Sequence, residues 1–136
     1  MSEKRKVALY IRVAQKDDEI AKDQETTLRG YAEEHGYRNV LAYVDNGFSG
    51  LDMNRPALNR LQEDIAAGMV SRVIVKDISR VSRSFLEVPG WINSIRRYGV
   101  SFTSVQDSLT EESFEAKDTL FQLLYEHLEG KEHQPL

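Results

Sequence analysis

The chain has 136 residues, of which 40% are hydrophobic and 29% are charged; this composition excludes a disordered chain and fits one domain with its own core. It contains no cysteine and no apolar run near the ~20 residues of a membrane span, which excludes disulfides, thiolate metal sites and a membrane partner, and we expect a cytoplasmic protein. The net charge of −4 excludes a strongly basic DNA-binding module, so the chain alone should bind DNA only weakly.

The first third of the chain predicts two strands around one helix. Residues 5–13 form an apolar run without clean alternation, which is typical of a strand covered on both faces. A helix is predicted from residues that recur at helical spacing, Ile20, Gln24, Thr27, Leu28, Tyr31 and Ala32, and Gly36 is a suitable C-terminal cap for it. Residues 39–45 predict the second strand, and residues 46–55 form a glycine-containing loop.

The middle of the chain repeats this pattern. Pro56 suits the first turn of a helix that ends at Gly68. Residues 71–77 predict a third strand, and residues 78–84 a polar loop or short helix.

A helix, a strand and a final helix complete the predicted elements. Residues 85–99 predict a helix in which Pro89-Gly90 threatens a break, and residues 100–106 predict the fourth strand. The last helix spans 114–129 and has a continuous apolar face.

The alternation of strands and helices predicts the fold class. We expect a flavodoxin-like or Rossmann-like α/β domain: a mostly parallel sheet of about four strands, with right-handed crossovers, helices on both faces and a helix at the C-terminal end. One domain over 1–129 and a disordered tail over 130–136 are expected.

Polar side chains converge on one edge of the predicted sheet, the edge formed by the carboxyl ends of the strands. Ligands in such folds bind at this edge. The strand ends and the loops that leave them carry Arg12, Ala14, Asp45, Ser49, Arg55, Lys76, Asp77, Arg80 and Arg83. Guanidinium groups bind phosphate oxygens bidentately, and fixed cations stabilise a phosphoryl transition state without a metal. The edge therefore predicts a phosphate site. The alternative is that Arg80 and Arg83 are solvent-exposed partners of Asp77 and Glu87.

Other site types are poorly supported. The three histidines lack metal-ligand spacing, and His35 is expected to flank a helix end. The acidic run formed by Asp107, Glu111, Glu112 and Glu115 is interpreted as a solvated loop and helix start. We therefore expect no metal and no cofactor.

Four separated stretches resemble the catalytic domain of serine site-specific DNA recombinases, the resolvase/invertase family. They are YIRVAQKDDE (10–19), DQETTL (23–28), YVDNGFSGLDMNRPAL (43–58) and VIVKDISRVSR (73–83), and the similarity runs from about Val7 to Val105. The last motif is closer to the large members of mobile elements than to small resolvases.

The resemblance implies a specific chemistry. Members of this family cut DNA with a serine hydroxyl that attacks a backbone phosphate, leaving a 5′-phosphoserine linkage and a free 3′-hydroxyl. The strands are exchanged within a tetramer, and the 3′-hydroxyls then reverse the reaction without metal or nucleotide. DNA and further copies of the chain are the implied partners.

The resemblance also implies a role for each matching residue. Arg12 is the strand-end arginine on the scissile phosphate, Gln24 reaches the site from its helix, and Arg80 and Arg83 grip the phosphate and assist the leaving oxygen. Arg55 matches the arginine before the next helix. Supporting positions are Asp45, Ser49, Lys76, Asp77 and Ser79, and Ser79 stands where small resolvases carry an aspartate.

Ala14 occupies the nucleophile position of the family motif. Alanine has no hydroxyl and cannot form the phosphoserine bond, so the chain is expected to be inactive as written. Ser49 and Ser82 lie in the same region, but we do not expect either to replace it. An engineered change and a natural degeneration remain equal explanations.

The last helix and the end of the chain differ from the family pattern. Phe121, Leu124 and Leu128 match the family's subunit interface, although simple core packing is the alternative, and we expect weak self-association. The family's C-terminal DNA-binding domain is expected to be absent. Two other functions stay open: a degenerate regulatory or oligomerisation module of a recombinase, and an unrelated flavodoxin-like binder of a phosphorylated ligand.

Overall fold

A four-stranded parallel sheet forms the centre of the molecule, as expected from the sequence. The computed structural model describes residues 5–84 and 86–108. The strand order is β2-β1-β3-β4, and all three strand pairs are parallel. The strands are β1 (Lys6–Val13), β2 (Val40–Asn46), β3 (Val70–Val75) and β4 (Ser101–Ser104).

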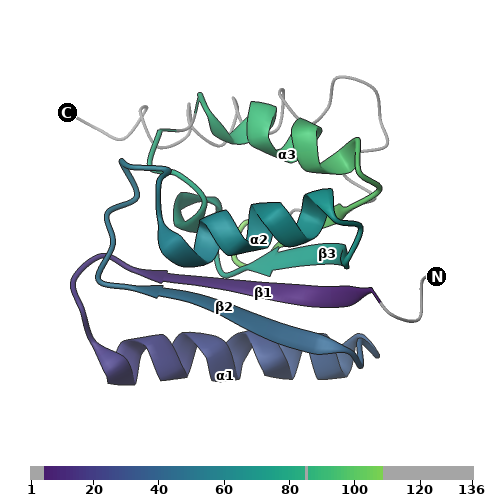
Figure 1. Cartoon of the computed structure of the whole chain (residues 1–136). Helices are drawn as coiled ribbons and strands as arrows, with labels where there is room; N and C mark the ends of the chain where they lie inside the picture. The colour runs from purple at the N-terminus through teal and green to yellow at the C-terminus, as the bar shows by residue number, and fades with distance from the viewer. Residues whose placement is uncertain (1–4, 85, 109–136) are drawn as a thin grey trace.

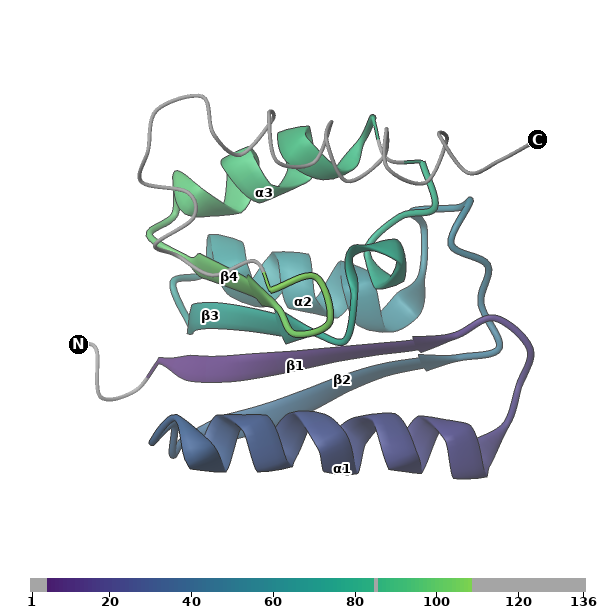
Figure 2. The same ribbon diagram turned by 180° about the vertical axis from the view of Figure 1, so that it is seen from behind.

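Helices cover both faces of the sheet, which confirms the predicted fold class for the described part of the chain. Figures 1 and 2 show α1 on one side of the sheet and α2 and α3 on the other. The helices are α1 (Asp18–Glu34), α2 (Pro56–Ala66) and α3 (Val88–Arg96), and a short 3-10 helix, η2, spans Ile78–Arg80.

β1 is buried on both faces because it lies inside the sheet between two helical layers. Leu9 and Ile11 belong to the core beneath α1, whereas Ala8 and Tyr10 belong to the core beneath α2 and α3. Successive side chains of a strand point to opposite faces, so an unbroken apolar run is what this position requires. The prediction from residues 5–13 is thereby confirmed.

Two helix starts differ from the predicted ones for local reasons. α1 begins before residue 20 because the Asp17 side chain caps it, accepting a hydrogen bond of 3.1 Å from Ile20 N. α3 begins at Val88 rather than at residue 85, since Pro89 lies in its first turn. Proline lacks the N–H that a helix interior needs, so it is accommodated at the start and causes no break.

The predicted final helix over 114–129 and the tail over 130–136 lie outside the described residues, as do Phe121, Leu124 and Leu128. Within residues 5–84 and 86–108, no helix is both long and apolar enough to cross a membrane.

Candidate active site

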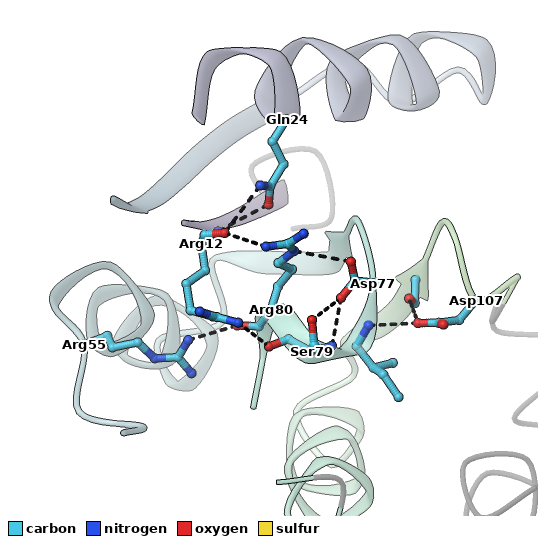
Figure 3. A network of polar contacts seen from close by, with 9 residues as sticks. Arg12, Gln24, Arg55, Asp77, Ser79, Arg80 and Asp107 are labelled. Carbon is cyan, nitrogen blue, oxygen red and sulfur yellow. Dashed lines mark hydrogen bonds and ion pairs between the residues drawn. The ribbon is translucent and has the colours of Figure 1, made fainter. Parts of the chain in front are cut away.

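The carboxyl edge of the sheet brings Arg12, Arg55 and Arg80 together (Figure 3). Arg12 is 2% exposed, and its guanidinium donates to three backbone carbonyls. Nε donates to Arg80 O at 3.2 Å, Nη1 to Phe48 O at 3.2 Å and Nη2 to Ser79 O at 2.8 Å. One side chain of β1 therefore joins the β2–α2 loop to the segment that follows β3.

Arg55 approaches the same carbonyl group from the start of α2. Its Nη1 donates to Arg80 O at 2.9 Å and its Nη2 to Val81 O, and its guanidinium carbon lies 5.7 Å from the centre of the Tyr10 ring. Arg55 is 1% exposed. The Arg80 carbonyl thus accepts from two buried guanidinium groups, which fixes the backbone of η2 beside the end of β1.

Gln24 takes the place of a strand neighbour beside Arg12. The pairing of β1 with β3 ends at Tyr10, so the peptide groups of Arg12 lie beyond it. Gln24 Oε1 accepts from Arg12 N at 3.3 Å, and Gln24 Nε2 donates to Arg12 O at 3.4 Å. Arg80 Nη1 donates to the same carbonyl oxygen at 3.0 Å. Buried peptide groups need such partners, which explains why glutamine lies on the buried face of α1.

The two paired arginines of the 73–83 motif have different surroundings. Arg80 Nε lies 3.3 Å from Asp77 Oδ2, and Asp77 caps η2 by accepting hydrogen bonds from the amide and hydroxyl of Ser79. This is the ion pair of the alternative interpretation, although Arg80 is half-buried rather than solvent-exposed. Arg83 is exposed, and its backbone N donates to Gly50 O at 2.9 Å. Among the described residues no ion pair joins Arg83 to Glu87, so the alternative of a surface ion pair does not apply to Arg83.

The site carries an excess of positive charge. Burial is the main cause that lowers the pKa of Arg12 from its ordinary value. The charges of Arg55, Arg80 and Arg83 lower that pKa further, in decreasing order, whereas Tyr10 raises it. In residues 5–84 and 86–108, neither Arg12 nor Arg55 has an ion pair with a carboxylate. Guanidinium groups stay charged in proteins, so such a cluster attracts an anion with several oxygens.

Asp45, near the end of β2, connects this strand to the start of α2 through hydrogen bonds. Its two oxygens accept from Ala57 N at 2.8 Å and Leu58 N at 3.0 Å, and Oδ2 also accepts from Tyr10 OH at 2.6 Å. Arg55, the residue at the N-terminal cap of α2, makes no side-chain cap of its own. The buried carboxylate therefore caps the helix from the neighbouring strand and sets where Arg55 enters the site.

Tyr10→Phe is expected to change how stability depends on pH. Burial, and then the hydrogen bond to Asp45, raise the pKa of Tyr10 well above its ordinary value. The folded state therefore keeps the phenol protonated, and its contribution is complete below about pH 10 and lost as the pH rises further. We expect the variant to be less stable by about 1–2 kcal/mol at pH 8.

Between pH 10 and 11, the decline in unfolding free energy should be shallower in Tyr10→Phe by up to about 1.4 kcal/mol per pH unit. Urea unfolding at several pH values measures both effects. Tyr98→Phe, at an exposed tyrosine, is the matched control. A decline as steep as that of the unsubstituted chain would contradict the assignment to Tyr10.

Ala14 lies at the end of β1 and is exposed. The preceding carbonyl, Val13 O, accepts from Gly47 N at 2.7 Å and Phe48 N at 3.0 Å, which holds the β2–α2 loop beside this position. The two serines considered as replacement nucleophiles have different surroundings. Ser82 is fully buried and its Oγ accepts from Ser84 N, whereas Ser49 is exposed and its Oγ accepts from Leu51 N. Lys76 is half-buried beside Gln24.

Sequence reasoning missed two contributors to this edge, Gly50 and Tyr10, and was wrong about a third, Asp107. Gly50 is buried against Arg12, and a Cβ there would lie 2.8 Å from Arg12 Cζ and 2.5 Å from Arg83 Cγ. Tyr10 shares a strand face with Arg12, two residues away, which is the signal that could have found it. Asp107 is not simply solvated, because its Oδ2 accepts from Ile78 N at 2.8 Å and from Ser104 Oγ at 2.6 Å. Among the described residues, no cluster of histidine, cysteine or acidic side chains could hold a metal ion.

These features define a parallel α/β domain with a cationic, phosphate-compatible site at the carboxyl edge of its sheet. The chain matches the family "Resolvase, N terminal domain" over residues 7–129. It therefore belongs to this family, the catalytic domain of serine recombinases.

Individual relatives agree with the family. The chain is 38% identical over 81 residues to a putative DNA recombinase of Bacillus subtilis (strain 168), and the match covers 59% of this chain but only 16% of that protein's length. The catalytic domain of TP901-1 integrase is similar in structure, with a TM-score of 0.77 and 30% identity over 94% of this chain and 97% of that one. A resolvase-family recombinase of Streptococcus pneumoniae has a TM-score of 0.72 and 26% identity, over 95% and 89% of the two chains.

Proposed function

We propose that the carboxyl edge of the sheet binds a DNA phosphodiester in the reaction of site-specific recombination. The observation that supports this most directly is the cluster of Arg12, Arg55 and Arg80, in which two buried guanidinium groups lack a carboxylate partner among the described residues. Membership of the serine recombinase family supports the same function, and DNA and further copies of the chain are the proposed partners.

The proposed roles follow from where the side chains lie. Arg83 is exposed beside Gly50 and is free to meet a phosphate directly, whereas Arg12 is enclosed by the carbonyls of Phe48, Ser79 and Arg80. Arg12 therefore contributes charge in this arrangement, and it reaches a phosphate oxygen only if one of its carbonyl bonds is exchanged. Arg55, Asp45 and Gln24 hold the backbone that positions these groups.

Position 14 decides whether covalent chemistry is possible. In the family reaction a serine oxygen forms a bond to phosphorus, its proton is removed, and the bond from phosphorus to the 3′ oxygen breaks, so that the 3′-hydroxyl leaves. Ala14 supplies no such oxygen. We propose that this chain binds the phosphodiester but cannot cut it.

Restoring the hydroxyl is the direct test. The Ala14→Ser chain, tethered to a DNA-binding domain of known sequence and given DNA with the matching site, should form a covalent protein–DNA adduct that survives denaturation. We expect more than about 10³-fold more adduct than from the unsubstituted chain, because removal of a nucleophile costs at least that much. Ala14→Gly, with the same tether, is the control for the change at this position.

Two outcomes would contradict the proposal. Equal adduct from Ala14→Ser and Ala14→Gly would show that another group attacks the phosphate, and Ser49→Ala would then identify it. A folded Ala14→Ser chain that occupies its DNA and yields no adduct would show that the site is not the catalytic one.

A second function is favoured by the combination of Ala14 with a complete arginine cluster. A chain that folds and binds DNA without cutting it would inhibit an active relative by entering mixed assemblies. Co-purification with an active homologue and loss of recombination in proportion to the amount of this chain would support this function, and the absence of both would exclude it.

A further inference from the structure

The edge of the sheet opposite the candidate active site also gathers basic side chains, although the chain as a whole is acidic. This edge is formed by the amino ends of the parallel strands, at the right of Figure 1. Its basic residues are Arg5, Lys6, Arg38, Arg72, Arg96 and Arg97. We call Arg5, Arg38, Arg72 and Arg97, with the cavity described below, the amino-edge surface.

Arg5 connects the turns that meet at this edge. Its Nη2 donates to Val70 O at 2.7 Å and to Gly99 O at 3.0 Å, and its own carbonyl accepts from Asn39 Nδ2 at 3.2 Å. These contacts join the start of β1 to the starts of β3, β4 and β2. Arg38 directly precedes Asn39 and Arg97 lies two residues before Gly99, and both arginines are exposed.

One donor at the centre of this surface is unused. The Nε atom of Arg5 is buried and has no hydrogen-bond partner among the described residues. The same is true of the Nε atoms of Arg55 and Arg80, and because these atoms are shielded from solvent, the exposed guanidinium groups are what a ligand would meet.

A surface cavity of about 520 Å³ lies between the end of α3 and the start of β4, and its lining includes Gly99, whose carbonyl accepts from Arg5. Its lining is polar and basic and consists of Asn93, Arg96, Arg97, Gly99, Val100 and Ser101. Gly99 has a φ of +77°, a conformation that favours glycine and lets the chain turn tightly into β4. The turn leaves amide, hydroxyl and guanidinium groups around one opening, which suits an anion.

Aromatic rings accompany the cations on the same edge. The guanidinium carbon of Arg72 lies 5.1 Å from the centre of the Tyr37 ring, and the Tyr31 and His35 rings are stacked with centroids 4.0 Å apart. Arg72 also donates to Thr103 Oγ1 at 2.9 Å, which holds it in place. These ring contacts help to fix the position of Arg72, and the charges of the surface are what a phosphate backbone would meet.

We propose that the amino-edge surface is a second nucleic-acid site, which binds the phosphodiester backbone of a DNA duplex. Several separated cations fit a row of phosphates better than a single phosphate group. The exposed carboxylates of Glu33 and Glu34, at the end of α1, limit the surface on one side. The surface does not share side chains with the candidate active site, so the two can be tested separately.

The geometry implies that the amino-edge surface and the candidate active site bind different DNA duplexes. The six residues of β3 separate the two edges by about 17 Å, and the edges face opposite ways along the strands. A straight duplex cannot lie on both. The amino-edge surface would therefore hold a second DNA segment, or a distant part of the same molecule.

Charge reversal of the two exposed arginines tests the proposal. Arg38→Glu combined with Arg97→Glu is compared with Lys22→Glu combined with Arg60→Glu, which makes the same change in net charge at exposed positions of α1 and α2. Fluorescence anisotropy with a labelled duplex at low salt measures affinity. We expect at least about 10-fold weaker binding for the amino-edge variant and less than about threefold for the control, and a salt slope smaller by about 1.8 if two phosphate contacts are lost.

The measurement is repeated in an Arg83→Glu background, which removes an exposed cation from the candidate active site. If duplex binding remains in the Arg83→Glu background and still depends on Arg38 and Arg97, it supports the amino-edge surface. This result holds whether or not the proposed recombinase chemistry is found. In NMR titrations with the same duplex, the amides of Gly99 and Ser101 should shift. Equal losses in the two charge-reversed variants, no measurable duplex binding, or binding of anionic vesicles in place of DNA would overturn the proposal.

Discussion

Replacement of Asp45 by alanine is expected to lower the unfolding free energy by about 3 kcal/mol, because it leaves buried donors without an acceptor. Those donors are the amides of Ala57 and Leu58, at the start of α2, and the hydroxyl of Tyr10. Asp45 is 1% exposed, so water cannot replace the carboxylate without opening the structure. Urea unfolding measures the change.

Two controls separate capping from the general effect of losing a carboxylate. Asp45→Asn keeps one oxygen acceptor, and about half of the loss should remain. Asp23→Ala, at an exposed position of α1, should change the unfolding free energy by less than about 0.5 kcal/mol. If Asp45→Ala were no more harmful than Asp23→Ala, the cap across the two elements would not exist in solution.

Gly50→Ala should destabilise the chain by about 1–3 kcal/mol, the usual range for an added methyl group in a packed region. The new Cβ would lie 2.7 Å from Arg12 Nη2 and 2.5 Å from Arg83 Cγ. Arg12 cannot swing aside, because three carbonyls hold its guanidinium. The β2–α2 loop would have to lift from the end of β1, which a melting experiment and hydrogen exchange at Phe48 would both detect.

Gly30→Ala is the matched control for this substitution. Gly30 is inside α1, and apart from its chain neighbours and the nearby backbone of that helix no atom lies within 4 Å of the Cβ position. Alanine is the better helix former, so this variant should be more stable by about 0.5–1 kcal/mol. Opposite signs for the two glycines are therefore expected. Unchanged stability for Gly50→Ala would mean that the loop is not seated on Arg12.

The fold was predictable because its strands and helices have clear local patterns. The apolar run of residues 5–13 indicated a strand buried on both faces, and Pro56 marked the start of α2. A parallel topology then requires Arg12, Asp45 and Arg80 to lie at one edge, which is where the structure has them.

The contacts within that edge were not predictable, because backbone carbonyls make most of them. Sequence identifies an arginine but not the carbonyl oxygen that it will meet, and Arg12 is held by Phe48 O, Ser79 O and Arg80 O. The same reason hid the role of Asp45, whose partners are two amides in another element. Side chains that bond to backbone carry little sequence signature.

Because Ala14 is exposed, selection on the fold and selection on the chemistry act separately at this position. Its side chain lies at the surface just after β1, so neither a methyl group nor a hydroxymethyl group there alters the packed core. Selection for folding and stability therefore does not distinguish alanine from serine at position 14. A lineage can exchange alanine and serine at position 14 by one substitution in either direction, and only selection on DNA rearrangement itself would register the difference.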